Sequence, residues 1–206
     1  RMEAASNIYV ELAQADFGLI TGAGKFAFEL KNGNPEFALG PIDKNNLDAD
    51  TLFFQFTNPT TTVAANTKIE VGPVSYTFVD AIAPNTIAVA AEGFDAHVRV
   101  DGAEVFHLTG NLGFRKTPTE IVAVGTGMTV RMEAAANIYL ELADADFGLI
   151  AGAGKFAFEL KNGNPEIALG PIAKDDIDAD SLFFQFTNPT TTVAAGTEIK
   201  VGPVSY

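Results

Sequence analysis

The sequence predicts an all-β protein in which antiparallel hairpins follow one another in a tandem array and form an extended β-solenoid, tube or rod. Three observations support this fold class. A segment of 76 residues occurs twice, apolar and polar residues alternate with a period of two in most segments, and turn residues separate these segments. The repeat further indicates that each unit buries its apolar surface on its neighbours.

The repeat sets the domain organisation. Residues 131–206 match residues 1–76 without a gap and differ from them at 13 positions, so the period is 130 residues, and residues 77–130 occur once. A fixed period of this kind is the signature of a repeat architecture. We therefore assign residues 1–76 to the C-terminal part of one 130-residue repeat and residues 77–206 to one full repeat. We expect a longer array to continue on both sides.

The differences between the copies indicate how the unit is built. Most apolar residues that change are exchanged for apolar residues of similar volume, as a packed core tolerates. Lys68 and Glu70 become Glu198 and Lys200. Residues two apart in a strand share a face, so this exchange preserves a neutral pair and indicates a solvent-facing contact rather than a ligand site.

Alternation predicts strands along both copies. In residues 131–142 every second residue is apolar, which favours a strand, although these residues are also good helix formers and a helix is the alternative. The alternation is clearest in residues 25–31, 52–56, 68–71 and 94–101.

Turn residues lie between these segments. The turn signals are Asn-Gly, Asp-Gly, Asn-Pro and Gly-Pro pairs, at Asn32-Gly33, Asn162-Gly163, Asp101-Gly102, Asn58-Pro59 and Gly72-Pro73. Asn-Gly readily adopts positive φ and predicts a hairpin turn. Similar segments, each led by a proline, predict three hairpin modules per unit and begin at Pro35, Pro84, Pro118 and Pro165.

The composition excludes several classes of protein. The formal charge is −13 and the basic residues form no cluster, so we expect no nucleic-acid partner. The chain has no cysteine, which excludes disulfides, thiolate metal sites and thiol nucleophiles. No run approaches the roughly 18 apolar residues of a membrane helix, so we expect no membrane insertion.

Several segments carry a resemblance to known repeats. FGLIAGAGKFAFELKNGNPEIALG, VRVDGAEVFHLTGNLGFRK and FQFTNPTTTVAANTKIEVGPVSYTF resemble the repeat units of very large, repetitive bacterial surface or secreted proteins. The resemblance covers most of the 130-residue unit and consists of strand and turn residues. It implies an extracellular or cell-surface protein with an adhesin-like or filament-like role, and it carries no catalytic residues.

An acidic segment is the best candidate for a metal site. Residues 43–50 and 173–180 are rich in Asp and Asn, and Ca²⁺ prefers about six to eight oxygen ligands. The segment lacks the spacing, the glycine and the final Glu of an EF-hand loop, and a solvated acidic loop is the alternative. Asp48, Asp50, Asp178 and Asp180 are the same in both copies, so we take them as the candidate Ca²⁺ ligands.

Other candidate residues have simpler interpretations. His97 with Asp95 and Asp101 forms a possible metal or base site, but polar residues on one strand face more often contact only solvent. The Gly22–Lys25 segment lacks the spacing of a phosphate loop and is interpreted as a turn. Aromatic residues are expected to fill the core, with a lipid-lined groove as the alternative; they are Phe26, Phe28, Phe54, Phe56, Phe94, Phe106 and Phe114.

These observations favour a structural role over chemistry. We expect a structural repeat of an extracellular bacterial filament, stalk or adhesin shaft, with copies of itself or adjacent repeats as partners. Residues near Tyr206 are expected to meet a segment like residues 77–80 in head-to-tail contact, because an open sheet edge offers unpaired backbone groups. A Ca²⁺-dependent or glycan-binding adhesive module is the alternative, and no motif of the sequence indicates an enzyme.

Overall fold

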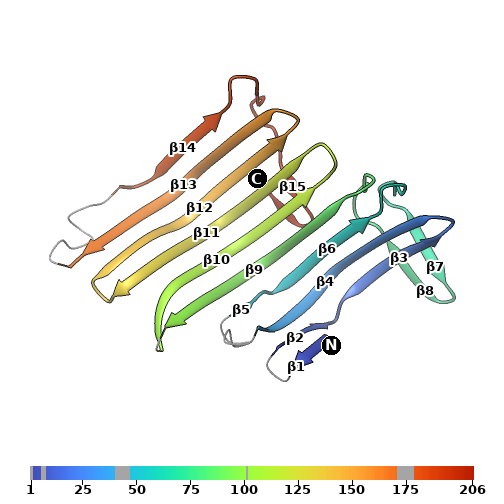
Figure 1. Cartoon of the computed structure of the whole chain (residues 1–206), viewed down its shortest axis with the longest axis horizontal. Coiled ribbons are helices and arrows are strands. Elements are labelled where there is room, and N and C mark those ends of the chain that lie inside the picture. Colours follow the sequence, from blue (N-terminus) through green and yellow to red (C-terminus); the bar gives the residue numbers. More distant parts are fainter. Residues whose placement is uncertain (1, 6–7, 40–46, 101, 171–178) are drawn as a thin grey trace.

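The computed structural model describes the chain except for residues 1, 6–7, 40–46, 101 and 171–178. The described residues form strands and turns without a helix, which confirms the all-β prediction. Most of the strands belong to one large antiparallel sheet, with β1 near one edge and β14 at the other (Figure 1). The predicted continuation of the hairpins into a solenoid, tube or rod stays a prediction.

In its first part the large sheet contains β1 (Met2–Ala5), β2 (Ile8–Ala13), β3 (Asp16–Gly22), β4 (Lys25–Leu39), β5 (Leu47–Asp48) and β6 (Thr51–Thr57). It continues with β9 (Ile87–Val100), β10 (Ala103–Lys116), β11 (Ile121–Ala135), β12 (Ile138–Gly152), β13 (Lys155–Leu169) and β14 (Leu182–Thr187). In the large sheet β9 to β14 form a meander in which each strand lies beside the next one along the chain. Earlier in the chain, β2 and β3 both pair with β4, and β5 and β6 both lie between β4 and β9. Two small hairpins complete the fold and are β7 (Lys68–Val71) with β8 (Val74–Thr77), and β15 (Lys200–Val201) with β16 (Val204–Ser205).

The segment that starts at Arg131 is a strand and not a helix. It runs in β11 to Ala135, turns over two residues, and returns as β12 from Ile138. The predicted turns at Gly22–Lys25 and Gly72-Pro73 are also present, between β3 and β4 and between β7 and β8. The choice of strand over helix is therefore confirmed, but the expectation of one unbroken strand over residues 131–142 is wrong, because the chain reverses at residues 136–137.

The turn predicted at Asn32-Gly33 is wrong. Both residues lie inside the long strand β4, where the register with β6 shifts between Leu30 and Gly33. Asn32 has φ 57°, and its amide donates to Asp16 Oδ2 at 2.8 Å. A bulge uses positive φ as a turn does, so the Asn-Gly pair bends the strand without reversing it. The same correction holds for Asn162-Gly163 in β13.

The prolines predicted to lead strands also divide into two groups. Pro84 and Pro118 each precede a strand, but Pro35 and Pro165 lie inside β4 and β13. Pro35 pairs with Leu12 and Pro165 with Leu142. The prediction that every such proline begins a strand is therefore wrong.

One face of the sheet is covered by the segments that follow β6 and β14. We call residues 58–86 the first covering segment and residues 188–206 the second. The side chains of Asn58 and Thr60 donate to the Gly24 carbonyl at 2.6 and 2.8 Å, and Phe26 N donates to Thr61 Oγ1 at 2.9 Å. The second copy repeats these bonds with Asn188, Thr190 and Thr191. The Asn-Pro-Thr-Thr sequence therefore fixes each covering segment to the turn at the end of the sheet.

The core lies between the sheet and these covering segments. One cluster joins small residues of the sheet to the β15–β16 hairpin, and contains Phe53, Ala88, Ala90, Val122, Val124, Ile199, Val201 and Val204. A second cluster lies under the first covering segment and contains Ala27, Val63, Tyr76, Phe78 and Ile82. Alanine and valine supply most of the sheet side, since Ala27, Ala88, Ala90, Val122 and Val124 are its small residues.

The expectation that the phenylalanines fill the core is wrong. Successive residues of a strand point to opposite faces, so Phe28 lies on the face opposite Ala27 and Glu29. The seven predicted phenylalanines are half-buried or exposed. Their rings contact one another across strands, with the centroids of Phe26 and Phe56 at 5.7 Å and those of Phe28 and Phe54 at 6.0 Å. Aromatic rows thus line the uncovered face of the sheet.

The two small hairpins have the same sequence pattern and different surroundings. The β15–β16 hairpin packs on β9, β10 and β11, and Val201 and Val204 are 1% and 3% exposed. The β7–β8 hairpin contacts β3, and the counterparts Val71 and Val74 are 79% and 70% exposed. The hairpin of the second copy is therefore buried against the middle of the sheet, whereas the hairpin of the first copy is largely exposed.

We expect the Val201→Ala variant to lose about 2 kcal/mol of unfolding free energy, because it leaves a cavity under the β15–β16 hairpin. Val71→Ala is the matched control and should change the stability by less than about 0.5 kcal/mol, since Val71 is exposed. Urea unfolding of the two variants measures the difference. Equal losses would contradict the packing of the second hairpin on the sheet.

Candidate functional site

Two of the predicted Ca²⁺ ligands lie beside the short strand β5, with Asp48 at its end and Asp50 between β5 and β6. Asp48 and Asp50 are exposed, and Asp48 Oδ1 accepts a hydrogen bond from Ala49 N at 2.8 Å. Asp180 is also exposed, and Asp178 lies outside the described residues. Among the described residues, none of these aspartates belongs to a group of three ligand atoms that could hold a metal ion. Ca²⁺ binding at this segment stays a prediction.

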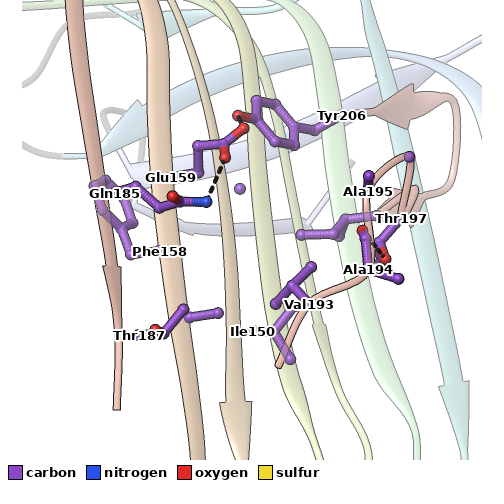
Figure 2. A pocket seen from close by; sticks show the side chains of 14 residues that line it. Ile150, Phe158, Glu159, Gln185, Thr187, Val193, Ala194, Ala195, Thr197 and Tyr206 are labelled. Carbon is purple, nitrogen blue, oxygen red and sulfur yellow. Dashed lines mark hydrogen bonds between the residues drawn. The ribbon is translucent and has the colours of Figure 1, made fainter. Parts of the chain in front are cut away.

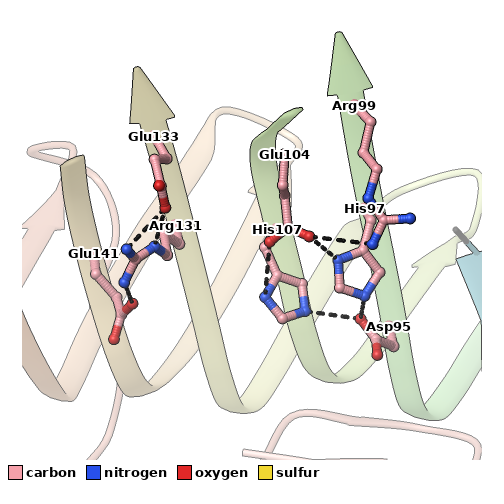
Figure 3. Close-up of polar contacts among 8 residues, drawn as sticks. All are labelled: Asp95, His97, Arg99, Glu104, His107, Arg131, Glu133 and Glu141. Carbon is pink, nitrogen blue, oxygen red and sulfur yellow. Dashed lines mark hydrogen bonds and ion pairs between the residues drawn. The ribbon is translucent and has the colours of Figure 1, made fainter. Parts of the chain in front are cut away.

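A cluster of histidines and carboxylates lies instead on adjacent strands (Figure 3). His97 of β9 is the register partner of His107 of β10, and their rings stack with centroids 4.1 Å apart. Both Nε2 atoms lie close to Asp95 Oδ1, at 3.0 Å from His97 and 2.9 Å from His107. Glu104 Oε2 lies 2.7 Å from His97 Nδ1. The cluster thus places two imidazoles between two carboxylates.

The sequence had joined His97 to Asp95 but missed His107 and Glu104. Asp101, the third residue of that prediction, lies outside the described residues. At the start of β10, Ala103 pairs with Val100 of β9. Continued without a shift, this register would place His97 opposite residue 106. A bulge between Glu104 and Phe106 moves the partner to His107, and alternation alone does not reveal a bulge.

The cluster has the donor set of a transition-metal site. One oxygen of Asp95 and one nitrogen from each of His97 and His107 lie within 4.8 Å of one another. Imidazole nitrogens with a carboxylate oxygen are ligands of Zn²⁺, whereas Ca²⁺ prefers oxygen ligands alone. The three residues are partly buried, so the group lies at the surface of the sheet and not in a cavity.

The same row of polar residues continues across β11 and β12 (Figure 3). Arg131 forms ion pairs with Glu133 at 2.8 Å and with Glu141 at 3.0 Å, and its guanidinium lies 3.9 Å from the ring centre of Tyr139. Partial burial lowers the pKa of Arg131, but hydrogen bonds with Glu141 and Glu133 outweigh this effect and raise it above its ordinary value. The row therefore ties neighbouring strands together by cross-strand pairs.

A buried carboxyl group anchors the first covering segment. Glu29 lies on β4 and is fully buried. It accepts hydrogen bonds from the side chain of Gln55, from Tyr76 OH at 2.8 Å and from Val79 N at 2.9 Å. Three donors satisfy the carboxyl oxygens, as a buried polar group requires. Alternation had placed Glu29 on the solvent face, and the covering segment turns that face into an interior.

The counterpart Glu159 lies in an open groove (Figure 2). It accepts hydrogen bonds from Tyr206 OH at 2.5 Å and from Gln185 Nε2 at 2.9 Å. The groove has a volume of about 370 Å³ and is lined by β12, β13, β14 and the second covering segment, with Ile150 and Val193 among its apolar residues. Apolar and polar side chains thus line the groove together, with the Glu159 carboxyl group among them.

Tyr76 and its counterpart Tyr206 are held in the protonated form. Burial raises the pKa of Tyr76, and the hydrogen bond and the charge of Glu29 raise it further. Burial also raises the pKa of Tyr206, with Glu159 adding to the shift. A phenol that donates to a carboxylate favours its neutral form, so both residues act as hydrogen-bond donors at neutral pH.

The chain matches no protein-family model, no curated protein and no solved structure. No helix that could span a membrane is found among the residues that the structure describes.

We expect the unfolding free energy to fall as the pH rises above 10.0, the ordinary pKa of tyrosine. The unfolded chain then loses phenolic protons that the folded chain retains, so ionisation favours unfolding. The stabilisation is fully present below this pH and is lost as the pH approaches the raised pKa values of the folded state. Chemical unfolding at a series of alkaline pH values measures the slope.

The Tyr76→Phe, Tyr206→Phe double variant is the control for this slope, because lysine residues also titrate in the alkaline range. Its stability should fall less steeply with pH than that of the wild type. The same slope in both proteins would contradict the assignment to these tyrosines.

Proposed function

We propose that the chain is a structural repeat segment of an extracellular filament, stalk or adhesin shaft. The observation that carries this proposal is that the second copy continues the sheet of the first with the same strand register. Glu29 pairs with Gln55 and Leu30 with Phe54 in the first copy, and their counterparts pair identically between β13 and β14. Continuous backbone hydrogen bonds therefore join the copies.

Side-chain packing also interlocks the repeats. The β15–β16 hairpin lies at the end of the full repeat, and its Val201 and Val204 share a core cluster with Phe53 of the preceding repeat. The Phe53 ring lies directly against Gly202, where an added Cβ would come within 2.4 Å of it. In turn, Phe78 and Ile82 of the full repeat are buried in a cluster with residues of the preceding repeat, which are Ala27, Val63 and Tyr76. A repeat that depends on its neighbour for its core is suited to an array and not to a chain of independent domains.

The strand order sets how far one repeat advances along such an array. Six strand positions separate β4 from its counterpart β13. Neighbouring strands lie about 4.8 Å apart, so each repeat would advance by about 29 Å across the sheet. An open sheet that grows in this way has the geometry of a ribbon or a shaft.

We expect chains extended by one, two and three further 130-residue units to lengthen by about 29 Å per unit, because strands are added side by side. The maximum dimension from small-angle X-ray scattering measures this growth. A maximum dimension that stays nearly constant, or scattering typical of flexibly linked globules, would contradict the structural proposal.

A second candidate function is the binding of a divalent transition-metal ion. It is favoured by the meeting of Asp95, His97 and His107 within 4.8 Å. The two histidines come from paired strands, so a bound ion would link β9 and β10 directly.

We expect Zn²⁺ to raise the melting temperature of the wild type, because an ion that binds only the folded state stabilises it. His107→Ala should abolish this rise, and Asp50→Ala should leave it unchanged. Thermal melts with Zn²⁺ and with EDTA measure the effect. A Zn²⁺ effect that persists in His107→Ala would contradict this candidate function. A rise in melting temperature with Ca²⁺ that Asp50→Ala removes would favour a metal site in the acidic segment.

A further inference from the structure

The two copies allow a covered site to be compared with an open one of nearly the same sequence. Directly after the first copy, residues 77–86 cross its sheet and bury Phe78 and Ile82 in the core. The Phe78 ring packs edge-on against Tyr76, with centroids 5.4 Å apart. Among the residues that the structure describes, no such segment covers the groove beside Tyr206.

The residues that line the groove differ in burial between the copies. Val63 is 3% exposed beneath the segment, whereas its counterpart Val193 is 40% exposed. Thr57 is fully buried, and its counterpart Thr187 is exposed. The open groove is therefore the place that residues 77–86 fill in the first copy.

Backbone groups also mark the path of this segment. Val63 N and O bond to Ile82 O and N at 3.0 and 2.8 Å, and Phe78 N donates to Thr67 O at 3.0 Å. Within the described part of the chain, Val193 N and O have no backbone hydrogen bond. They are positioned to pair with an extended segment.

Polar side chains are positioned for the same path. In the first copy Glu29 accepts from Val79 N, and Lys31 Nζ donates to the Thr77 carbonyl at 3.0 Å. Their counterparts are Glu159, which lines the open groove, and Lys161, whose Nζ lies 4.2 Å from the ring centre of Tyr206. The acceptor and the donor of the covered site are thus both present in the open one.

The two copies also differ in the pairing of the strand that follows the long strand, β6 in the first copy and β14 in the second. Strand β6 pairs with β4 on one side and with residues 87–92 of β9 on the other. Its counterpart β14 pairs with β13 alone among the described strands. Residues 87–92 follow the covering segment directly, so one continuous stretch both fills the groove and completes the edge.

We infer that the open groove and the edge of β14 bind a segment with the sequence of residues 77–92, supplied by a further repeat of this kind. The Phe78 and Ile82 positions fill the groove beside Ile150 and Val193, and the strand that follows pairs antiparallel with β14. This inference rests on the proposed structural role and names the contact through which the next repeat attaches.

A synthetic peptide of residues 77–92, labelled with a fluorophore and titrated with the full chain, tests the inference by anisotropy. We expect saturable binding of one peptide per chain. A peptide with Phe78→Ala and Ile82→Ala should bind about 100-fold more weakly or not at all, because two large apolar side chains leave the groove. Val193→Lys in the protein should also abolish binding, while Val71→Lys, an exposed position away from the groove, should not.

Appending residues 77–92 after Tyr206 provides a second measurement, in which the segment need not be captured from solution. The extended chain should melt at a higher temperature than the same chain with alanine at the appended Phe and Ile positions. Equal binding of the peptide to the wild type and to Val193→Lys would overturn the inference. It would also be overturned if the peptide does not bind and the appended segment adds no stability. Either result would leave the growth of longer arrays to be decided by their scattering, so the two proposals can fail separately.

Discussion

The hydrogen bond between a tyrosine of each covering segment and a glutamate of the sheet holds the covered face together. Tyr76 bonds to Glu29 and Tyr206 to Glu159, each over 47 residues of chain. The ring of Tyr76 lies directly on Gly18, where an added Cβ would come within 2.3 Å of it. A glycine beneath the ring and a carboxyl group beside its hydroxyl therefore let the covering segment lie flat on the strands, and the core between the segment and the sheet depends on that close approach.

Each repeat uses its two faces differently. The covered face carries small and polar residues that fit beneath backbone, and the opposite face carries rows of phenylalanines that contact one another across strands. At the far ends of the long strands, the row from Asp95 to Glu141 replaces apolar contacts with ion pairs. The long strands are thus held by backbone pairing throughout, by packing near one end and by charge pairs near the other.

The repeats are incomplete by themselves, and this property links the fold to the proposed function. The second hairpin finds its core on strands that precede it, whereas the first hairpin leaves Val71 and Val74 exposed. The first groove is filled by residues 77–86, whereas the second is open beside Glu159. Counterpart residues are therefore buried where other strands or segments of the array cover them, and exposed where none of the described residues does so.

The sequence by itself determined the repeat and its period, the all-β class, and the strand character of the segment that starts at Arg131, because these depend on local alternation and turn chemistry. It did not reveal that this segment reverses at residues 136–137. It did not determine that Asn32-Gly33 bends a strand without reversing it, since turns and bulges use the same positive φ. It also did not determine which side of each strand becomes interior. Glu29 is buried and Phe26 exposed because a segment more than 30 residues away in the sequence covers one face of the sheet. Only the tertiary structure brings His107 beside His97, because a single bulge changes which residues meet across two strands.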